Sequence, residues 1–175
     1  LIDDDHTALA LARIGYIKKL DDTAARAQAV PDALKDVAGL AYDRYNWLSS
    51  RGGRTEAIKI LRERSTSAAA LGQPFRWSSW RRVLARWEMR EGRAQSAYDL
   101  AANHFLTEGS SFADLEWIAG YVALTYLDKP ALALTHLQAA DATVDSPISE
   151  GRMQYWIGRT QAALGNQAAA QAAYT

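Results

Sequence analysis

The sequence predicts an all-α fold, built as a superhelical solenoid of about five antiparallel helical hairpins. Its composition is the first observation behind this prediction, because the chain is rich in alanine and has only 4 prolines and 11 glycines in 175 residues. Alanine is the best helix former, and proline and glycine are the poorest. No stretch of alternating β-branched and aromatic residues between turn residues predicts a strand.

A recurring turn motif is the second observation. In each copy a Gly or Asp is followed five residues later by an Ala, and successive copies begin 40, 36 and 37 residues apart. Periods of this length are typical of two-helix units such as tetratricopeptide and HEAT repeats. The Gly or Asp would end one helix, and the Ala would let the next helix lie close to it. The four pairs are Gly52 and Ala57, Gly92 and Ala97, Asp128 and Ala133, and Gly165 and Ala170.

Helix punctuation is the third observation, and it sets the expected elements in order. The prolines, among them Pro31 and Pro74, fall between periodic segments or in a first turn, where proline is tolerated. Ser146 before Pro147 predicts an N-cap, and residues 111–114 are expected to form another capping arrangement. The expected helices are 5–20, 22–30, 32–49, 55–71, 78–91, 94–104, 111–127, 130–143, 148–164 and 168–174.

We expect residues 1–175 to form a single α-superhelical domain. A hydrophobic content of 49% excludes a disordered chain, and no apolar run approaches the roughly 18 residues of a membrane span. The absence of cysteine excludes disulfides and a catalytic thiol. No signal peptide opens the chain, and its last expected helix is not a polar cap, so we expect a fragment of a larger chain.

Three of the six tryptophans are expected in the core. Trp80, Val83, Leu84 and Trp87 follow the i, i+3, i+4, i+7 spacing of an inward helical stripe, and Trp156 lies in a similar one. Trp77 is expected to precede its helix, where it either staples the helix entry or stays exposed to stack on a sugar.

A basic stripe is the main charged feature. It would bind an anionic polymer, such as nucleic acid or cell-wall peptide carboxylates. In the alternative reading, which we favour, acidic residues of adjacent repeats neutralise it. Nucleic acid is not an expected partner, because no recognition motif accompanies the stripe. The stripe consists of Arg82, Arg86, Arg90 and Arg93, and the neutralising residues would be Asp99, Asp114 and Glu116.

No motif points to a metal or to catalysis. His6, His104 and His136 are far apart in the sequence and lack the spacing of a metal site. Nucleophile, phosphate-loop and dinucleotide motifs are absent, and no carboxylate pair is placed for glycosidase chemistry. We therefore expect no cofactor, no metal ion and no catalytic residue in this chain.

Several stretches in order resemble a known family. The most specific are Glu-Trp-Ile-Ala-Gly at 116–120 and Tyr-Trp-Ile-Gly-Arg at 155–159. The chain thereby resembles the α-superhelical region of soluble lytic murein transglycosylases, especially the α-proteobacterial type. The resemblance covers nearly the whole chain, more weakly before residue 31. The other stretches are 31–34, 39–48, 53–57, 80–86, 97–101, 103–106, 112–115, 121–124 and 146–149, together with Arg152.

In that family the superhelix precedes a lysozyme-like catalytic domain. The full enzyme cleaves the MurNAc–GlcNAc β-1,4 bond of peptidoglycan and leaves a 1,6-anhydro product. The family's catalytic Glu typically stands before a Ser, whereas none of the seven glutamates here does. The resemblance therefore implies a non-catalytic scaffold, located in the periplasm. Its implied partners are the glycan strand and the catalytic domain of the same parent chain.

If one face of this chain binds the glycan strand, we expect it to include Trp77, Arg81, Arg82 and Arg86. A stand-alone tetratricopeptide-like adaptor that binds a protein partner is the competing interpretation. The repeat period fits it equally well, since both are helical-hairpin solenoids.

Overall fold

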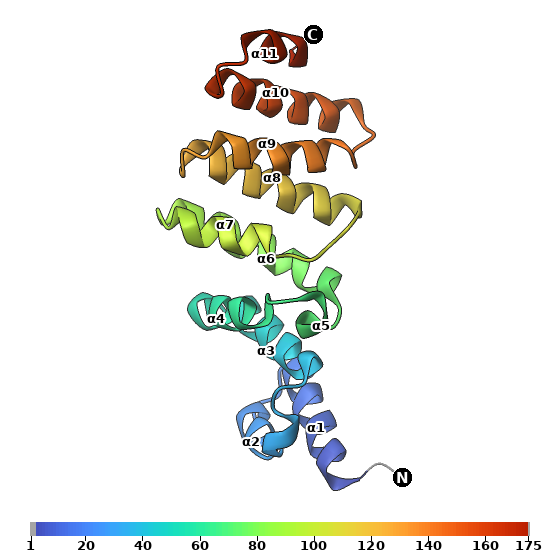
Figure 1. Cartoon of the computed structure of the whole chain (residues 1–175). Helices are drawn as coiled ribbons and strands as arrows, with labels where there is room; N and C mark the ends of the chain where they lie inside the picture. The colour runs from blue at the N-terminus through green and yellow to red at the C-terminus, as the bar shows by residue number, and fades with distance from the viewer. Residues whose placement is uncertain (1–2, 175) are drawn as a thin grey trace. The chain divides into compact units, whose positions relative to one another are not determined.

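The computed structural model describes residues 3–174, and it is helical throughout that part of the chain (Figure 1). The prediction of an all-α fold is confirmed, because no strand occurs among these residues. The superhelical path and the number of hairpins stay predictions. The helices are α1 (Asp4–Lys18), α2 (Thr23–Gln28), the 3-10 turn η1 (Asp32–Leu34), α3 (Ala38–Ser50), α4 (Arg54–Arg64), α5 (Ala68–Leu71), α6 (Pro74–Arg90), α7 (Ala94–Ala102), α8 (Gly109–Thr125), α9 (Pro130–Asp141), α10 (Pro147–Ala163) and α11 (Gln167–Ala173).

The chain divides into two compact units, and the boundary along the sequence lies within α6, between Trp80 and Arg81. In the first unit α1 packs on α2 and α3, and α3 packs on α4. In the second unit each helix from α7 to α11 packs on the next one (Figure 1). Consecutive helices are therefore neighbours in space throughout α7 to α11, whereas in the first unit α1 also packs on α3. The single domain expected over 1–175 stays a prediction.

The recurring turn motif is confirmed in its local structure. Its Gly and Asp residues all adopt a left-handed backbone, with φ of 84°, 75°, 52° and 83° in chain order. The alanine five residues later is buried in every copy, with at most 3% of its surface exposed. In three of the copies the residue after the Gly donates its N–H to the carbonyl five residues earlier, which closes the helix end. These bonds are Gly53 to Leu48 at 2.9 Å, Arg93 to Glu88 at 3.0 Å and Asn166 to Gln161 at 2.9 Å.

Two expected helices are interrupted. The expected helix 32–49 is instead η1 followed by α3, which begins at Ala38. The expected helix 55–71 ends after Arg64, where the Ser65 hydroxyl donates to the Leu61 carbonyl at 2.6 Å. Ser67 then caps α5 by accepting the Ala70 N–H at 3.0 Å. Serine side chains compete for backbone hydrogen bonds, which explains a break that hydrophobic spacing does not show.

The two expected caps differ in outcome. Ser146 caps α10 as predicted, because its hydroxyl accepts the Ser149 N–H at 3.3 Å and Pro147 follows in the first turn. The arrangement expected at 111–114 is wrong, because α8 begins earlier, at Gly109. Residues 111–114 lie within that helix.

The buried face of α6 also differs from the prediction. The helix begins at Pro74, so Trp77 lies inside it. Trp80 and Trp87 are only half-buried and Val83 is exposed, which corrects their assignment to the inward stripe. Apolar spacing alone does not identify this face, because the face includes the charged residues Arg81 and Glu88. The buried residues are Trp77, Ser78, Arg81, Leu84, Ala85 and Glu88.

Glycine allows a close contact between α8 and α9 in the second unit. A Cβ atom added to Gly120 of α8 would lie 2.7 Å from Leu137 Cγ and 3.1 Å from the Ala133 carbonyl oxygen of α9. Real Cβ atoms do not approach a neighbour at 2.7 Å, so α8 and α9 would have to move apart. By contrast, Gly151 of α10 has no neighbour within 4 Å of such an atom.

Alanine substitutions at these two glycines should therefore have opposite effects. Gly120→Ala should lower the free energy of unfolding by about 1–3 kcal/mol, because it overpacks the α8–α9 contact. Gly151→Ala should raise it by about 0.5–1 kcal/mol, because alanine is the better helix former and meets nothing. Urea unfolding of both variants and the parent chain measures the difference. Equal changes in both variants would contradict the close contact.

Candidate functional site

Two of the four residues expected to bind a glycan are buried. The Trp77 side chain is 1% exposed, its ring centroid lies 4.8 Å from that of Tyr45, and its Nε1–H donates to the Leu71 carbonyl at 3.1 Å. Arg81 is 0% exposed, and its Nη1 donates to the Leu100 carbonyl at 2.8 Å. The possibility that Trp77 stays exposed is wrong. Neither residue reaches a surface ligand in this conformation.

The other two, Arg82 and Arg86, converge on a single carboxylate. Asp114 Oδ2 lies 3.2 Å from Arg82 Nη1 and 3.6 Å from Arg86 Nη2, and Asp114 Oδ1 lies 3.9 Å from Arg152 Nη2. The expected neutralisation of the basic stripe is therefore confirmed at Asp114. One carboxylate balances only one of three guanidinium groups, so the cluster keeps a positive charge.

The other two expected neutralising residues have different partners. Asp99 accepts a hydrogen bond from Gln95 Nε2 at 2.8 Å. Glu116 is bound by two histidines, as described below. Both had been assigned to the arginine stripe from charge alone, and that assignment is corrected.

An aromatic cluster lies beside the arginines in the second unit. Trp117 and Tyr121 of α8 stack with ring centroids 5.3 Å apart and planes 15° apart. Trp156 of α10 meets Tyr121 edge-on at 4.9 Å, and it lies 6.4 Å from Trp117. Tyr155, next to Trp156, is 47% exposed.

Arginines also cover this cluster. The Arg152 guanidinium lies 5.1 Å from the Trp117 ring centroid, and the Arg159 guanidinium lies 5.8 Å from that of Trp156. Arg152 thus joins the aromatic rings to the arginines on Asp114. We call this set the arginine–aromatic surface. It consists of Arg82, Arg86, Asp114, Trp117, Tyr121, Arg152, Tyr155, Trp156 and Arg159.

Sequence reasoning missed most of this surface. It assigned Trp156 to the core and gave no role to Trp117 or Tyr121. The i, i+4 spacing of Trp117 and Tyr121 is the signal that indicates one aromatic face on a helix. Chemically, aromatic faces suit the apolar faces of sugar rings, and guanidinium groups suit carboxylates.

A buried polar cluster lies deeper in the second unit. The Glu116 carboxylate lies 2.8 Å from His104 Nε2 and 2.6 Å from His136 Nδ1. The Tyr98 hydroxyl lies 3.0 Å from His136 Nε2. These residues come from α7, from the segment after α7, from α8 and from α9. Their distance in the sequence is why no motif indicated them.

The backbone fixes the protonation of one histidine. The Leu106 N–H donates to His104 Nδ1 at 2.9 Å, so that nitrogen holds no proton. His104 Nε2 is therefore the nitrogen that donates to Glu116. Burial raises the pKa of Glu116, but the hydrogen bonds from His104 and His136 outweigh it and lower the pKa to about 2.

Each carboxylate oxygen of Glu116 has a histidine partner inside the unit. Among residues 3–174, no group of three or more His, Asp or Glu side chains is arranged to hold a metal ion. In the same part of the chain, every helix is too short or too polar to span a bilayer.

Comparison with known proteins leaves the family open, since no protein-family model, no curated protein and no solved structure matches this chain.

The histidine–glutamate cluster makes stability depend on acid pH. The folded pKa of Glu116, about 2, lies below its ordinary value of 4.5. Its contribution is therefore complete above pH 4.5, and it is lost as the pH falls toward 2. A shift of this size corresponds to roughly 3 kcal/mol of unfolding free energy.

Glu116→Gln keeps the shape of the side chain and removes the titration. The parent chain should be more stable than this variant at pH 6, and the difference should shrink between pH 4.5 and 2. Urea unfolding at a series of pH values measures it. A difference that stays constant over that range would show that Glu116 does not titrate with the expected pKa.

Proposed function

We propose that this chain is the non-catalytic α-superhelical region of a peptidoglycan lytic transglycosylase. One observation carries the proposal. The two stretches that most resemble that family, 116–120 and 155–159, supply Trp117 and Trp156, and these two rings lie 6.4 Å apart in one cluster. The motifs behind the resemblance thus contribute to a surface whose chemistry suits a glycan.

Peptidoglycan presents both kinds of group that the arginine–aromatic surface can bind. Its sugar rings have apolar faces that stack on aromatic side chains. Its peptides end in carboxylates, which pair with guanidinium groups. Each contact is weak at an exposed surface, but contacts along one polymer add through effective concentration.

The remaining parts of this proposal follow from the same resemblance. The chain would act as a scaffold in the periplasm and bind the glycan strand. A lysozyme-like domain of the same parent chain would cleave the MurNAc–GlcNAc bond to the 1,6-anhydro product. The catalytic Glu-Ser pair of the family does not occur in these 175 residues.

A tetratricopeptide-like adaptor is the second candidate. The left-handed turns and the buried alanines that follow them support it, because they recur at 40, 36 and 37 residues. The adaptor would bind one protein partner saturably and have no affinity for murein.

Murein binding should require the arginines at Asp114. The double variant Arg82→Gln and Arg86→Gln removes two guanidinium groups from the arginine–aromatic surface. We expect its affinity for purified murein sacculi to fall at least about fivefold, measured by co-sedimentation. Lys18→Gln and Lys59→Gln together remove the same charge from exposed positions of the first unit, and binding should be unchanged.

The outcomes separate the two candidates. If the parent chain does not sediment with sacculi, the murein proposal fails and the adaptor becomes the working function. If both double variants bind like the parent chain, the surface described here is not the binding site. Circular dichroism of each variant shows whether a loss of binding reflects a loss of helix.

A further inference from the structure

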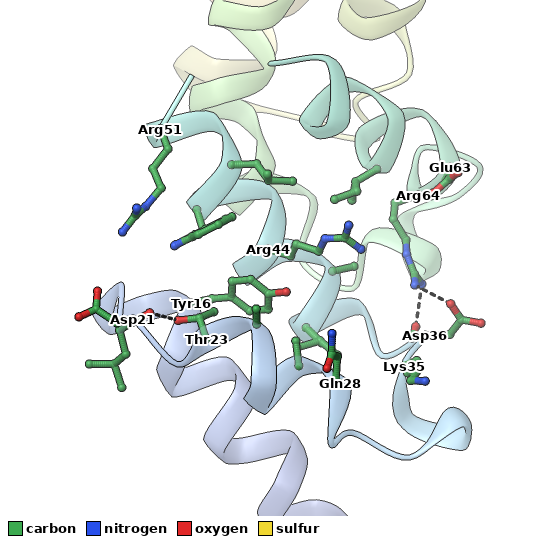
Figure 2. Close-up of a pocket in the computed structure, with 18 residues that line it drawn as sticks. Tyr16, Asp21, Thr23, Gln28, Lys35, Asp36, Arg44, Arg51, Glu63 and Arg64 are labelled. Carbon is green, nitrogen blue, oxygen red and sulfur yellow. Dashed lines mark hydrogen bonds and ion pairs between the residues drawn. The ribbon is translucent and has the colours of Figure 1, made fainter. Parts of the chain in front are cut away.

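A cavity of about 770 Å³ lies in the first unit, among α1 to α4 (Figure 2). Cavities of about 300–1,000 Å³ are typical of sites for small organic ligands. Tyr16 of α1, Gln28 of α2, and Arg44 and Trp47 of α3 line it, together with Lys35 from the segment before α3. This cavity shares no residue with the arginine–aromatic surface.

Arg44 is the cation of this cavity that the described chain leaves unpaired. Arg64 donates to the Asp36 carbonyl at 2.7 Å, and Lys35 binds Asp32 at 2.6 Å. The Arg51 guanidinium lies 4.9 Å from the Trp47 ring centroid. Arg44 makes no hydrogen bond or ion pair with any residue between 3 and 174, and Figure 2 shows its guanidinium extending into the cavity.

Tyr16 places a second hydrogen-bond donor beside the cavity. The residue is 8% exposed, and its ring packs edge-on against Trp47 at 5.7 Å. Its hydroxyl makes no hydrogen bond to the described residues and is not among the fully buried polar atoms, so a ligand in the cavity can reach it. Burial raises the pKa of Tyr16, an effect that the charge of Arg44 opposes, so the hydroxyl stays a donor at neutral pH.

The charges around the cavity limit what it can hold. Lys35 is paired with Asp32, and the remaining arginines Arg44, Arg51 and Arg64 are balanced in number by Asp21, Asp36 and Glu63. A balanced cavity with one guanidinium free to bind fits a ligand with a single negative charge better than a dianionic phosphate ester. A guanidinium beside a hydroxyl donor suits a carboxylate.

We propose that this cavity binds a small monocarboxylate of about dipeptide size. Its carboxylate accepts hydrogen bonds from Arg44 and from the Tyr16 hydroxyl. Its apolar part packs against Trp47 and Leu40, which also line the cavity. This inference does not depend on the murein proposal, because it rests on the first unit alone.

Calorimetric titration of the whole chain with three N-acetyl dipeptides, Ala-Ala, Ala-Leu and Ala-Phe, tests the proposal. At least one should bind saturably, and its C-terminal carboxamide should bind at least about tenfold more weakly. Arg44→Gln should weaken the acid by a similar factor, and Tyr16→Phe should weaken it several-fold. Lys18→Gln removes a charge outside the cavity and should bind like the parent chain.

Three results with the dipeptide acids would overturn the proposal. They are no saturable binding of any of the three acids, equal binding of acid and carboxamide, and binding unaffected by both Arg44→Gln and Tyr16→Phe. Tighter binding of phenyl phosphate than of the acids would assign the cavity to phosphate and also overturn it. The two variants are judged separately, so a folding defect in one leaves the other as the test. Murein sedimentation is unaffected by these outcomes.

Discussion

Close approach of neighbouring helices is the constraint on which both units depend. Four turns between helices pass through a left-handed residue, and the alanine five residues after it is buried in each case. A larger side chain at Ala97 or Ala133, both 0% exposed, would push the helices apart. Gly120 applies the same constraint between α8 and α9, and Gly158 applies it to the contact of α10 with Tyr174. Small residues thus set the distance between packed helices, and large side chains fill the space between them.

Buried charges set the rotation of the helices once the spacing is set. Arg81 binds the Leu100 carbonyl, and Glu88 binds Arg93 at 2.8 Å and the Ser96 hydroxyl. An unpaired charge in these positions would be costly, so α6 has one favourable orientation over α7 in the second unit. Apolar contacts alone would tolerate several orientations, because apolar side chains of similar size can replace one another.

The helices and the repeat could be predicted from local signals, because proline, glycine and serine act within one turn of where they stand. The left-handed turn at Gly92 and the cap at Ser146 are examples. The buried face of α6 could not be predicted, because it is decided by partners elsewhere in the chain. From the sequence alone Arg81 would be predicted at the surface, because its partner, the Leu100 carbonyl, lies on another helix. The candidate site could not be predicted for the same reason, because Trp117 of α8 and Trp156 of α10 become neighbours only in the folded chain.

Helix α8 carries residues of both the buried histidine–glutamate cluster and the arginine–aromatic surface. Glu116 points inward, where His104 and His136 hold both of its oxygens. Successive residues of an α-helix are about 100° apart around its axis, so fixing Glu116 also fixes the direction of Trp117. Asp114, two residues earlier, is fixed in the same way and gathers the arginines. A binding surface is selective only when its groups are held in place by the layer beneath them. In this chain that layer is a carboxylate between two histidines, and it holds the half-buried Asp114 and Trp117 in place on the same helix.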